Sequence, residues 1–133
     1  MRSGAIDRRT AQADSTIDEW SRALCGQLQL GWPRPPGRVI GFCWPVRKEP
    51  DLRPQILDWV ARGATAVLPV VVAPDAPLLF RPWVPDAGGG AMVADRYGIP
   101  TPVAGPELVP DALLLPLNAF DRAGYRIGYG GGF

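Results

Sequence analysis

The sequence predicts an α/β protein in which helices and a mainly parallel sheet form three layers. Short apolar runs at residues 38–44 and 66–72 are typical of strands that are buried on both faces. An amphipathic segment at residues 51–62 separates them, so the three elements form a β-α-β unit with a short crossover. A length of 133 residues suits one domain, and we expect a single domain over residues 1–133.

The two predicted helices follow from periodicity and from the residues that end it. The first covers residues 14–30. Its apolar residues recur at three- and four-residue spacing: Ile17, Trp20, Leu24 and Leu28. Residues 31–37 end this helix, because their three prolines cannot continue it. In the second helix, Pro54 is tolerated in the first turn and Gly63 marks the C-terminal end.

Beyond the β-α-β unit the pattern is less regular. Residues 77–83 are predicted as a strand or extended segment at a sheet edge, since Pro82 cannot donate a ladder hydrogen bond. Residues 86–90 contain three glycines and are predicted as a mobile loop. Residues 112–117 form another apolar run and are predicted as a last buried strand.

Composition excludes several classes of function. A net charge of +1 gives no broad basic field, so no nucleic-acid partner is expected. The apolar runs fall far short of the roughly 18 residues that span a bilayer, and the N-terminus lacks a secretory pattern, so we expect no membrane partner and a cytoplasmic location. The absence of histidine excludes Ser-His-Asp triads. Cys25 and Cys43 are expected to be unpaired, buried small hydrophobes.

Residues 128–132 contain four glycines and are the most site-like feature of the chain. Consecutive glycine amides can converge on a phosphate, and the segment follows a predicted strand. It is not a Walker A loop, and Phe133 stands where a dinucleotide fingerprint has its third glycine. A phosphate loop also normally continues into a helix. From these residues alone, a phosphate loop and a flexible glycine-rich tail remain open.

Five stretches together resemble the 5-formyltetrahydrofolate cyclo-ligase family, also called 5,10-methenyltetrahydrofolate synthetase. They are residues 41–49 (GFCWPVRKE), 68–71 (LPVV), 79–83 (LFRPW), 97–100 (YGIP) and 109–132, and the most specific part is residues 119–133 (AFDRAGYRIGYGGGF). The resemblance implies a Rossmann-like fold of the NagB/RpiA/CoA transferase type. It also implies an enzyme, monomeric when complete, that uses ATP and Mg²⁺ to convert 5-formyltetrahydrofolate to 5,10-methenyltetrahydrofolate.

The same resemblance implies two sets of site residues. The substrate-binding residues are Trp44, Glu49, Tyr129, Gly130, Gly131, Gly132 and Phe133. The ATP-binding residues are Arg2, Arg126, Ile127, Gly128, Tyr129, Gly130, Gly131, Gly132 and Phe133.

Individual residues also allow a plainer interpretation. Glu49 would accept hydrogen bonds from pterin N–H groups, although its spacing alone favours a solvated acid near a helix start. Trp44 suits a core aromatic as well as a ligand contact. Arg2, near the N-terminus, suits a solvated side chain. Arg81 and Trp83 match the family pattern and are assigned to packing.

The chain departs from the family pattern in three places. A Lys-containing start of the N-terminal basic segment is missing before Met1, and Phe133 stands where relatives carry Tyr. The family continues after the glycine loop with Tyr-Asp-Arg, whose Asp binds magnesium, so no metal ligand is expected within the chain. The expectation is a domain that is incomplete at its C-terminus. An inactive remnant and a generic phosphate-binding α/β module are the alternatives.

Overall fold

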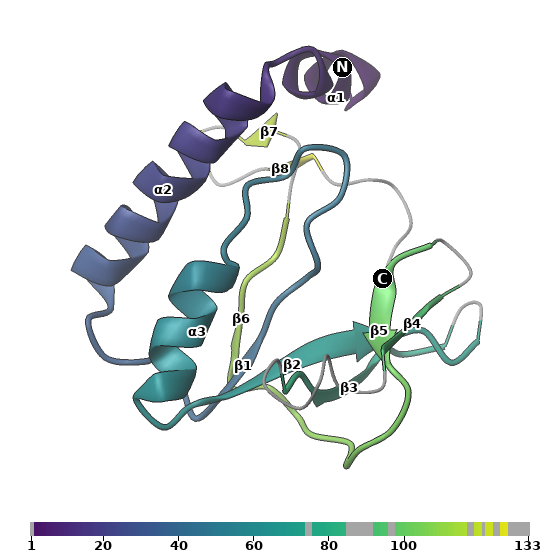
Figure 1. Ribbon diagram of the computed structural model, residues 1–133. Helices are drawn as coiled ribbons and strands as arrows, with labels where there is room; N and C mark the ends of the chain where they lie inside the picture. Colours follow the sequence, from purple (N-terminus) through teal and green to yellow (C-terminus); the bar gives the residue numbers. More distant parts are fainter. Residues whose placement is uncertain are drawn as a thin grey trace.

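The computed structural model describes residues 2–73, 76–84, 92–95, 98–116, 119–120, 122–123 and 126–127 (Figure 1). The elements in chain order are α1 (Arg2–Thr10), α2 (Asp14–Gly31), β1 (Val39–Gly41), α3 (Arg53–Ala61), β2 (Thr65–Val70), β3 (Leu79–Pro82), β4 (Met92–Ala94), β5 (Pro100–Pro102), β6 (Ala112–Leu113), β7 (Ala119–Phe120) and β8 (Arg126–Ile127).

The central sheet has the strand order β3-β2-β1-β6. Strand β1 pairs in parallel with both neighbours, so that Ile40 lies opposite Ala66 of β2 and Ala112 of β6. Strand β3 pairs antiparallel with β2, as suits an edge strand that ends in Pro82. Strands β4 and β5 form a separate antiparallel pair, and so do β7 and β8. The predicted α/β fold with a mainly parallel sheet is confirmed.

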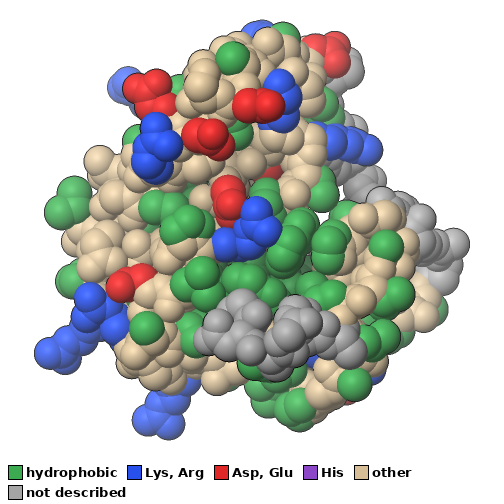
Figure 2. All heavy atoms as spheres, in the orientation of Figure 1, with side chains coloured by type: hydrophobic (Ala, Val, Ile, Leu, Met, Phe, Trp, Pro, Cys, Tyr) green, Lys and Arg blue, Asp and Glu red, His purple; other side chains and the backbone are tan. Residues whose placement is uncertain are grey.

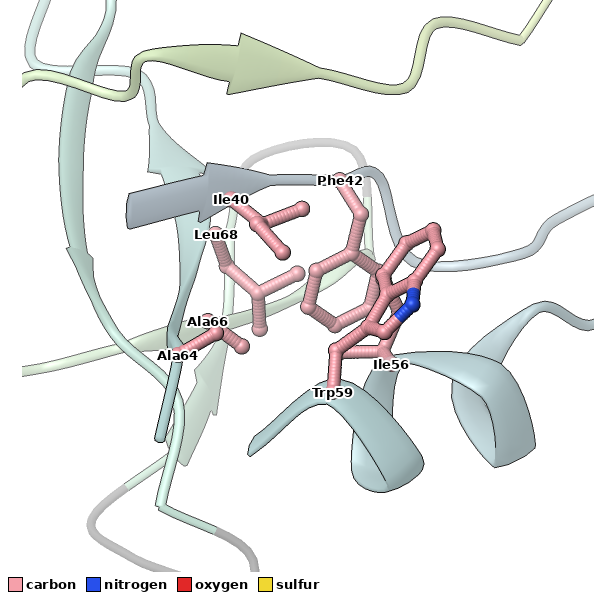
Figure 3. Close-up of a cluster of buried hydrophobic side chains, with 7 residues drawn as sticks. All are labelled: Ile40, Phe42, Ile56, Trp59, Ala64, Ala66 and Leu68. Atoms are coloured by element: carbon pink, nitrogen blue, oxygen red, sulfur yellow. The ribbon is translucent and has the colours of Figure 1, made fainter. Parts of the chain in front are cut away.

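The core lies between the sheet and α3 (Figure 3). Side chains of Ile40 and Phe42 meet Leu68 of β2 on one side and Ile56 and Trp59 of α3 on the other, and all five are at most 2% exposed. Helix α2 packs on α3 (Figure 1). The Trp59 indole N–H donates to the carbonyl of Trp32, at 3.0 Å, just after α2. This hydrogen bond satisfies the one polar atom of a fully buried ring, as buried Trp requires.

Strand β6 is fastened to the start of β1 by a carboxylate. The two oxygens of Asp111 accept hydrogen bonds from the backbone N–H groups of Arg38 (3.1 Å) and Val39 (3.0 Å), and the Asp111 N–H donates back to the Val39 carbonyl (2.9 Å). These hydrogen bonds, that from Arg38 first, hold the pKa of Asp111 below its ordinary value. Gly37 leaves room for the carboxylate, because a Cβ there would lie 2.2 Å from Asp111 Oδ1.

Two sequence expectations need correction, and helix α1 was not predicted at all. The predicted buried strand at 112–117 shortens to β6, whose Leu113 is 43% exposed, with Leu115 47% exposed, because β6 lies at the edge of the described sheet. Cys25 and Cys43 are unpaired, but each is only partly buried.

Two predicted loops, residues 86–90 and 128–132, lie outside the described residues. Within the part of the chain that the structure describes, no helix is both long and apolar enough to cross a membrane.

Candidate functional site

The chain leaves β1 through a tight turn at residues 46–49. The Glu49 N–H donates to the Val46 carbonyl at 2.9 Å, and the Val46 N–H donates to Glu49 Oε1 at 2.9 Å. Between them, Arg47 and Lys48 have φ angles of 50° and 60°. The left-handed region is unfavourable for non-glycine residues, and two in succession persist only where surrounding contacts hold them.

The surrounding contacts come from the corner between α1 and α2. The Arg9 guanidinium donates from Nε to the Arg47 carbonyl at 2.9 Å. The Lys48 ammonium donates to the carbonyl of Gln12 and forms an ion pair of 3.5 Å with Asp14. Figure 2 shows acidic and basic side chains side by side over the end of the molecule that carries α1 and α2. The turn is therefore fastened to the N-terminal helices at two successive residues.

Glu49 is the buried acid of this turn, with 6% of its surface exposed. It lines a surface pocket of about 270 Å³ between the start of α2 and residues 45–53. The other lining residues are Asp14, Ile17, Asp18, Ser21, Pro45, Val46, Arg47, Lys48, Asp51 and Arg53. A second pocket of about 290 Å³ shares Asp18, Ser21 and Asp51 with it, so the two form one groove along α2. The groove lies beyond the carboxyl end of β1, where open α/β sheets bind their ligands.

Trp44 precedes the turn at residues 46–49 and lies between the Arg53 guanidinium and the Trp83 ring. The Arg53 guanidinium lies over the Trp44 ring at 4.4 Å, and the Trp83 ring meets it edge-on at 6.0 Å. Asp51 holds the guanidinium with two hydrogen bonds of 2.8 Å, and these keep the pKa of Asp51 below its usual range. Trp83 also packs on Phe42 at 5.2 Å, in line with its assignment to packing.

The groove is tied to α2 through Ser21. Its buried hydroxyl donates to the Ile17 carbonyl at 2.8 Å and accepts from the Asp51 N–H at 2.9 Å. The neighbouring thiol of Cys43 offers no nucleophile at neutral pH. Burial, followed by the negative charge of Glu49, raises its pKa to about 11, so the thiol stays protonated.

The predicted ATP site falls largely outside the described residues. Gly128, Tyr129, Gly130, Gly131, Gly132 and Phe133 lie outside them. Of Arg126 and Ile127 the structure describes the backbone, in β8, and of Arg2 the backbone, in α1. The described residues contain no group of three metal-ligating side chains, so they do not by themselves fit a magnesium site.

Sequence reasoning missed the residues that support the predicted pair. Arg9, Lys48, Asp51 and Arg53 position Trp44 and Glu49, yet none belongs to the quoted pattern except Lys48. The one available signal was the position of Asp51 two residues before Arg53, a spacing at which an Asp side chain can accept the backbone N–H two residues on. Indeed, the Arg53 N–H also donates to Asp51 Oδ1 at 3.0 Å.

The geometry defines an α/β protein with a groove beyond the end of its first parallel strand. Two of the solved structures that share its fold are 5,10-methenyltetrahydrofolate synthetases. The NMR structure of Aquifex aeolicus 5,10-methenyltetrahydrofolate synthetase matches 97% of this chain and 65% of that chain, with a TM-score of 0.80 and 22% identity. The 5,10-methenyltetrahydrofolate synthetase from Mycoplasma pneumoniae matches 99% of this chain and 71% of that chain, with a TM-score of 0.73 and 19% identity.

The chain thus has the fold of the 5,10-methenyltetrahydrofolate synthetases and supports the sequence resemblance at that level. It spans just under two thirds, 65%, of the Aquifex protein. No family model matches the sequence. No curated protein matches it either.

Proposed function

We propose that this chain carries the folate-binding part of a 5-formyltetrahydrofolate cyclo-ligase, which uses ATP and Mg²⁺ to form 5,10-methenyltetrahydrofolate. The observation that carries the proposal is the fold shared with two 5,10-methenyltetrahydrofolate synthetases over 97% and 99% of this chain. We further propose, from the family resemblance, that the complete enzyme is a cytoplasmic monomer.

The position of Glu49 supports a folate site. A buried carboxylate beside a pocket can accept N–H groups from a flat heterocycle, and such hydrogen bonds are strong because the acceptor is charged. The pocket of about 270 Å³ is close to the lower limit of typical ligand sites, roughly 300 Å³, and suits a bicyclic ring better than a whole folate. The remainder of the ligand would extend along the groove toward Ser21 and Arg22.

The proposed reaction needs charge stabilisation rather than a protein nucleophile. The formyl oxygen of 5-formyltetrahydrofolate attacks the γ-phosphorus of ATP, and ADP leaves. N10 then attacks the activated formyl carbon and loses its proton to solvent, and phosphate leaves, which closes the ring. The absence of histidine and the protonated Cys43 thiol are compatible with this scheme. On it, Glu49 orients the pterin, and the glycine segment at 128–132 binds the phosphates.

Two measurements test the proposal. The first is the ultraviolet absorbance of 5,10-methenyltetrahydrofolate formed from 5-formyltetrahydrofolate by the purified chain, with and without ATP and Mg²⁺. The second is calorimetric titration of 5-formyltetrahydrofolate into the chain. ATP-dependent product formation would establish the activity. Binding without turnover would favour the inactive remnant, and the absence of both would refute the proposal.

A further inference from the structure

The turn at residues 46–49 has an unfavourable backbone conformation and is held by contacts with residues 9–14. The proposed reaction does not itself require these contacts. Arg47 and Lys48 both adopt left-handed φ angles, although neither is Gly, Asn or Asp. A lysine and an arginine gain nothing intrinsic from that conformation. Strain of this kind marks sites where neighbouring structure imposes a geometry, so the contacts that impose it point to the role of the turn.

One of these contacts reaches the backbone of Arg47, and the others are made by the side chain of Lys48. Lys48 sends its ammonium to the Gln12 carbonyl and to Asp14, and Arg9 donates to the Arg47 carbonyl. Both anchors belong to the corner between α1 and α2, more than thirty residues earlier in the chain. The Lys48 side chain is 34% exposed, so its hydrogen bond is only partly screened by water.

The geometry points to Lys48 as a positioning residue for Glu49, a role that rests on the proposed folate site. With Lys48 held, the turn stays closed and the Glu49 carboxylate accepts the Val46 N–H at 2.9 Å, within the pocket wall. With Lys48 released, the strained φ angles relax and the Glu49 carboxylate loses its fixed direction. Lys48 also lines the pocket, and the role inferred for it here is the one that it exerts through Glu49.

Two substitutions separate the contacts of the Lys48 ammonium with Gln12 and Asp14, called the Lys48 clamp below, from the backbone conformation of the turn. Lys48→Asn keeps a residue that tolerates the left-handed region but removes the ammonium, whereas Lys48→Arg keeps a cationic donor. We expect Lys48→Asn to weaken 5-formyltetrahydrofolate binding by roughly 5- to 20-fold, the loss expected for one partly screened charged hydrogen bond. ATP affinity should stay within about twofold, because the Lys48 clamp acts on the Glu49 carboxylate. Lys48→Arg should restore most of the folate affinity.

Hydrogen exchange supplies a readout that needs no ligand. The Val46 amide, which donates to Glu49, should exchange roughly tenfold faster in Lys48→Asn than in the wild type or Lys48→Arg, because local opening becomes easier. Unchanged exchange and unchanged folate affinity in Lys48→Asn would overturn the inference. So would equal loss of both ligands together with a lower melting temperature, which would make Lys48 a general structural residue.

Folate binding and the effect of Lys48 on the turn at residues 46–49 can be tested separately. If the wild type does not bind 5-formyltetrahydrofolate, the folate site and the positioning role fall together. A faster Val46 exchange in Lys48→Asn would then still show that Lys48 holds the turn.

Discussion

The role of Glu49 can be tested by two substitutions that remove different parts of its carboxylate. Glu49→Gln keeps an oxygen that can accept the Val46 N–H, which Glu49 Oε1 now accepts at 2.9 Å, but it removes the negative charge. Glu49→Ala removes both. The pair therefore distinguishes a carboxylate that binds a ligand from one that only holds the turn.

The magnitudes follow from the contacts. A hydrogen bond to a charged group contributes about 1.5–3 kcal/mol and a neutral one about 0.5–1.5 kcal/mol. The difference of about 1–1.5 kcal/mol corresponds to a roughly 5- to 13-fold weaker binding of 5-formyltetrahydrofolate by Glu49→Gln. Glu49→Ala also leaves the Val46 N–H without its acceptor, and this should lower the free energy of unfolding by about 1–3 kcal/mol.

Calorimetric titration of 5-formyltetrahydrofolate and, separately, of ATP measures the binding, and urea unfolding measures the stability. Glu107→Gln removes the same charge at an exposed position outside the described groove and serves as the matched control. If Glu49→Gln weakens both ligands equally, or neither, the carboxylate does not face the pterin and its role is structural.

Three further outcomes are expected. Gly37→Ala should lower the midpoint of urea unfolding, since a Cβ there would meet Asp111 Oδ1 and displace the carboxylate from two backbone N–H groups; an unchanged midpoint would contradict the contact. Because the pKa of Asp111 is lowered from 3.8 in the folded state, its stabilisation is complete above about pH 4 and is lost as the pH falls through the lowered pKa. Melting temperatures between pH 6 and about pH 3 should therefore fall less steeply in Asp111→Asn than in the wild type, and parallel curves would exclude this linkage. Gly130→Val should raise the KM for ATP or abolish turnover, because a β-branched residue disfavours positive φ and blocks amide approach; wild-type kinetics would return this segment to a flexible tail.

The sequence predicted the central unit well because its signals are local. Residues 14–30 and 51–62 carry helical periodicity, and the structure places α2 and α3 there within two residues. Gly63, predicted as the stop of α3, follows the helix with a φ of +104°, a value that glycine adopts without strain. Patterns of this kind depend on the nearest few residues and are visible in the sequence.

The missed features depend on partners that are distant in the chain. Helix α1 has nine residues, three of them arginine, and its apolar residues are Ala5 and Ile6, so its apolar pattern is too short to predict a helix. The apolar run at residues 112–117 predicted a longer buried strand than β6. Strand β6 lies at the edge of the described sheet, and a local sequence pattern does not reveal a strand's place in a sheet. For the candidate site, resemblance indicated Trp44 and Glu49, but the supporting contacts of Arg9 and Arg53 are properties of three-dimensional packing.

The carboxylate of Asp111 also bears on the order in which the chain folds. Asp111 accepts hydrogen bonds from Arg38 and Val39, which lie 73 and 72 positions earlier in the chain. Strands β1 and β2, in contrast, pair Val39 with Thr65, only 26 positions apart (65 − 39). Closing the longer loop costs about 0.9 kcal/mol more in chain entropy by the logarithmic scaling. The β1–α3–β2 unit should therefore condense first, with β6 joining after the rate-limiting step. Loss of the Asp111 carboxylate would then chiefly accelerate unfolding and leave the folding rate nearly unchanged.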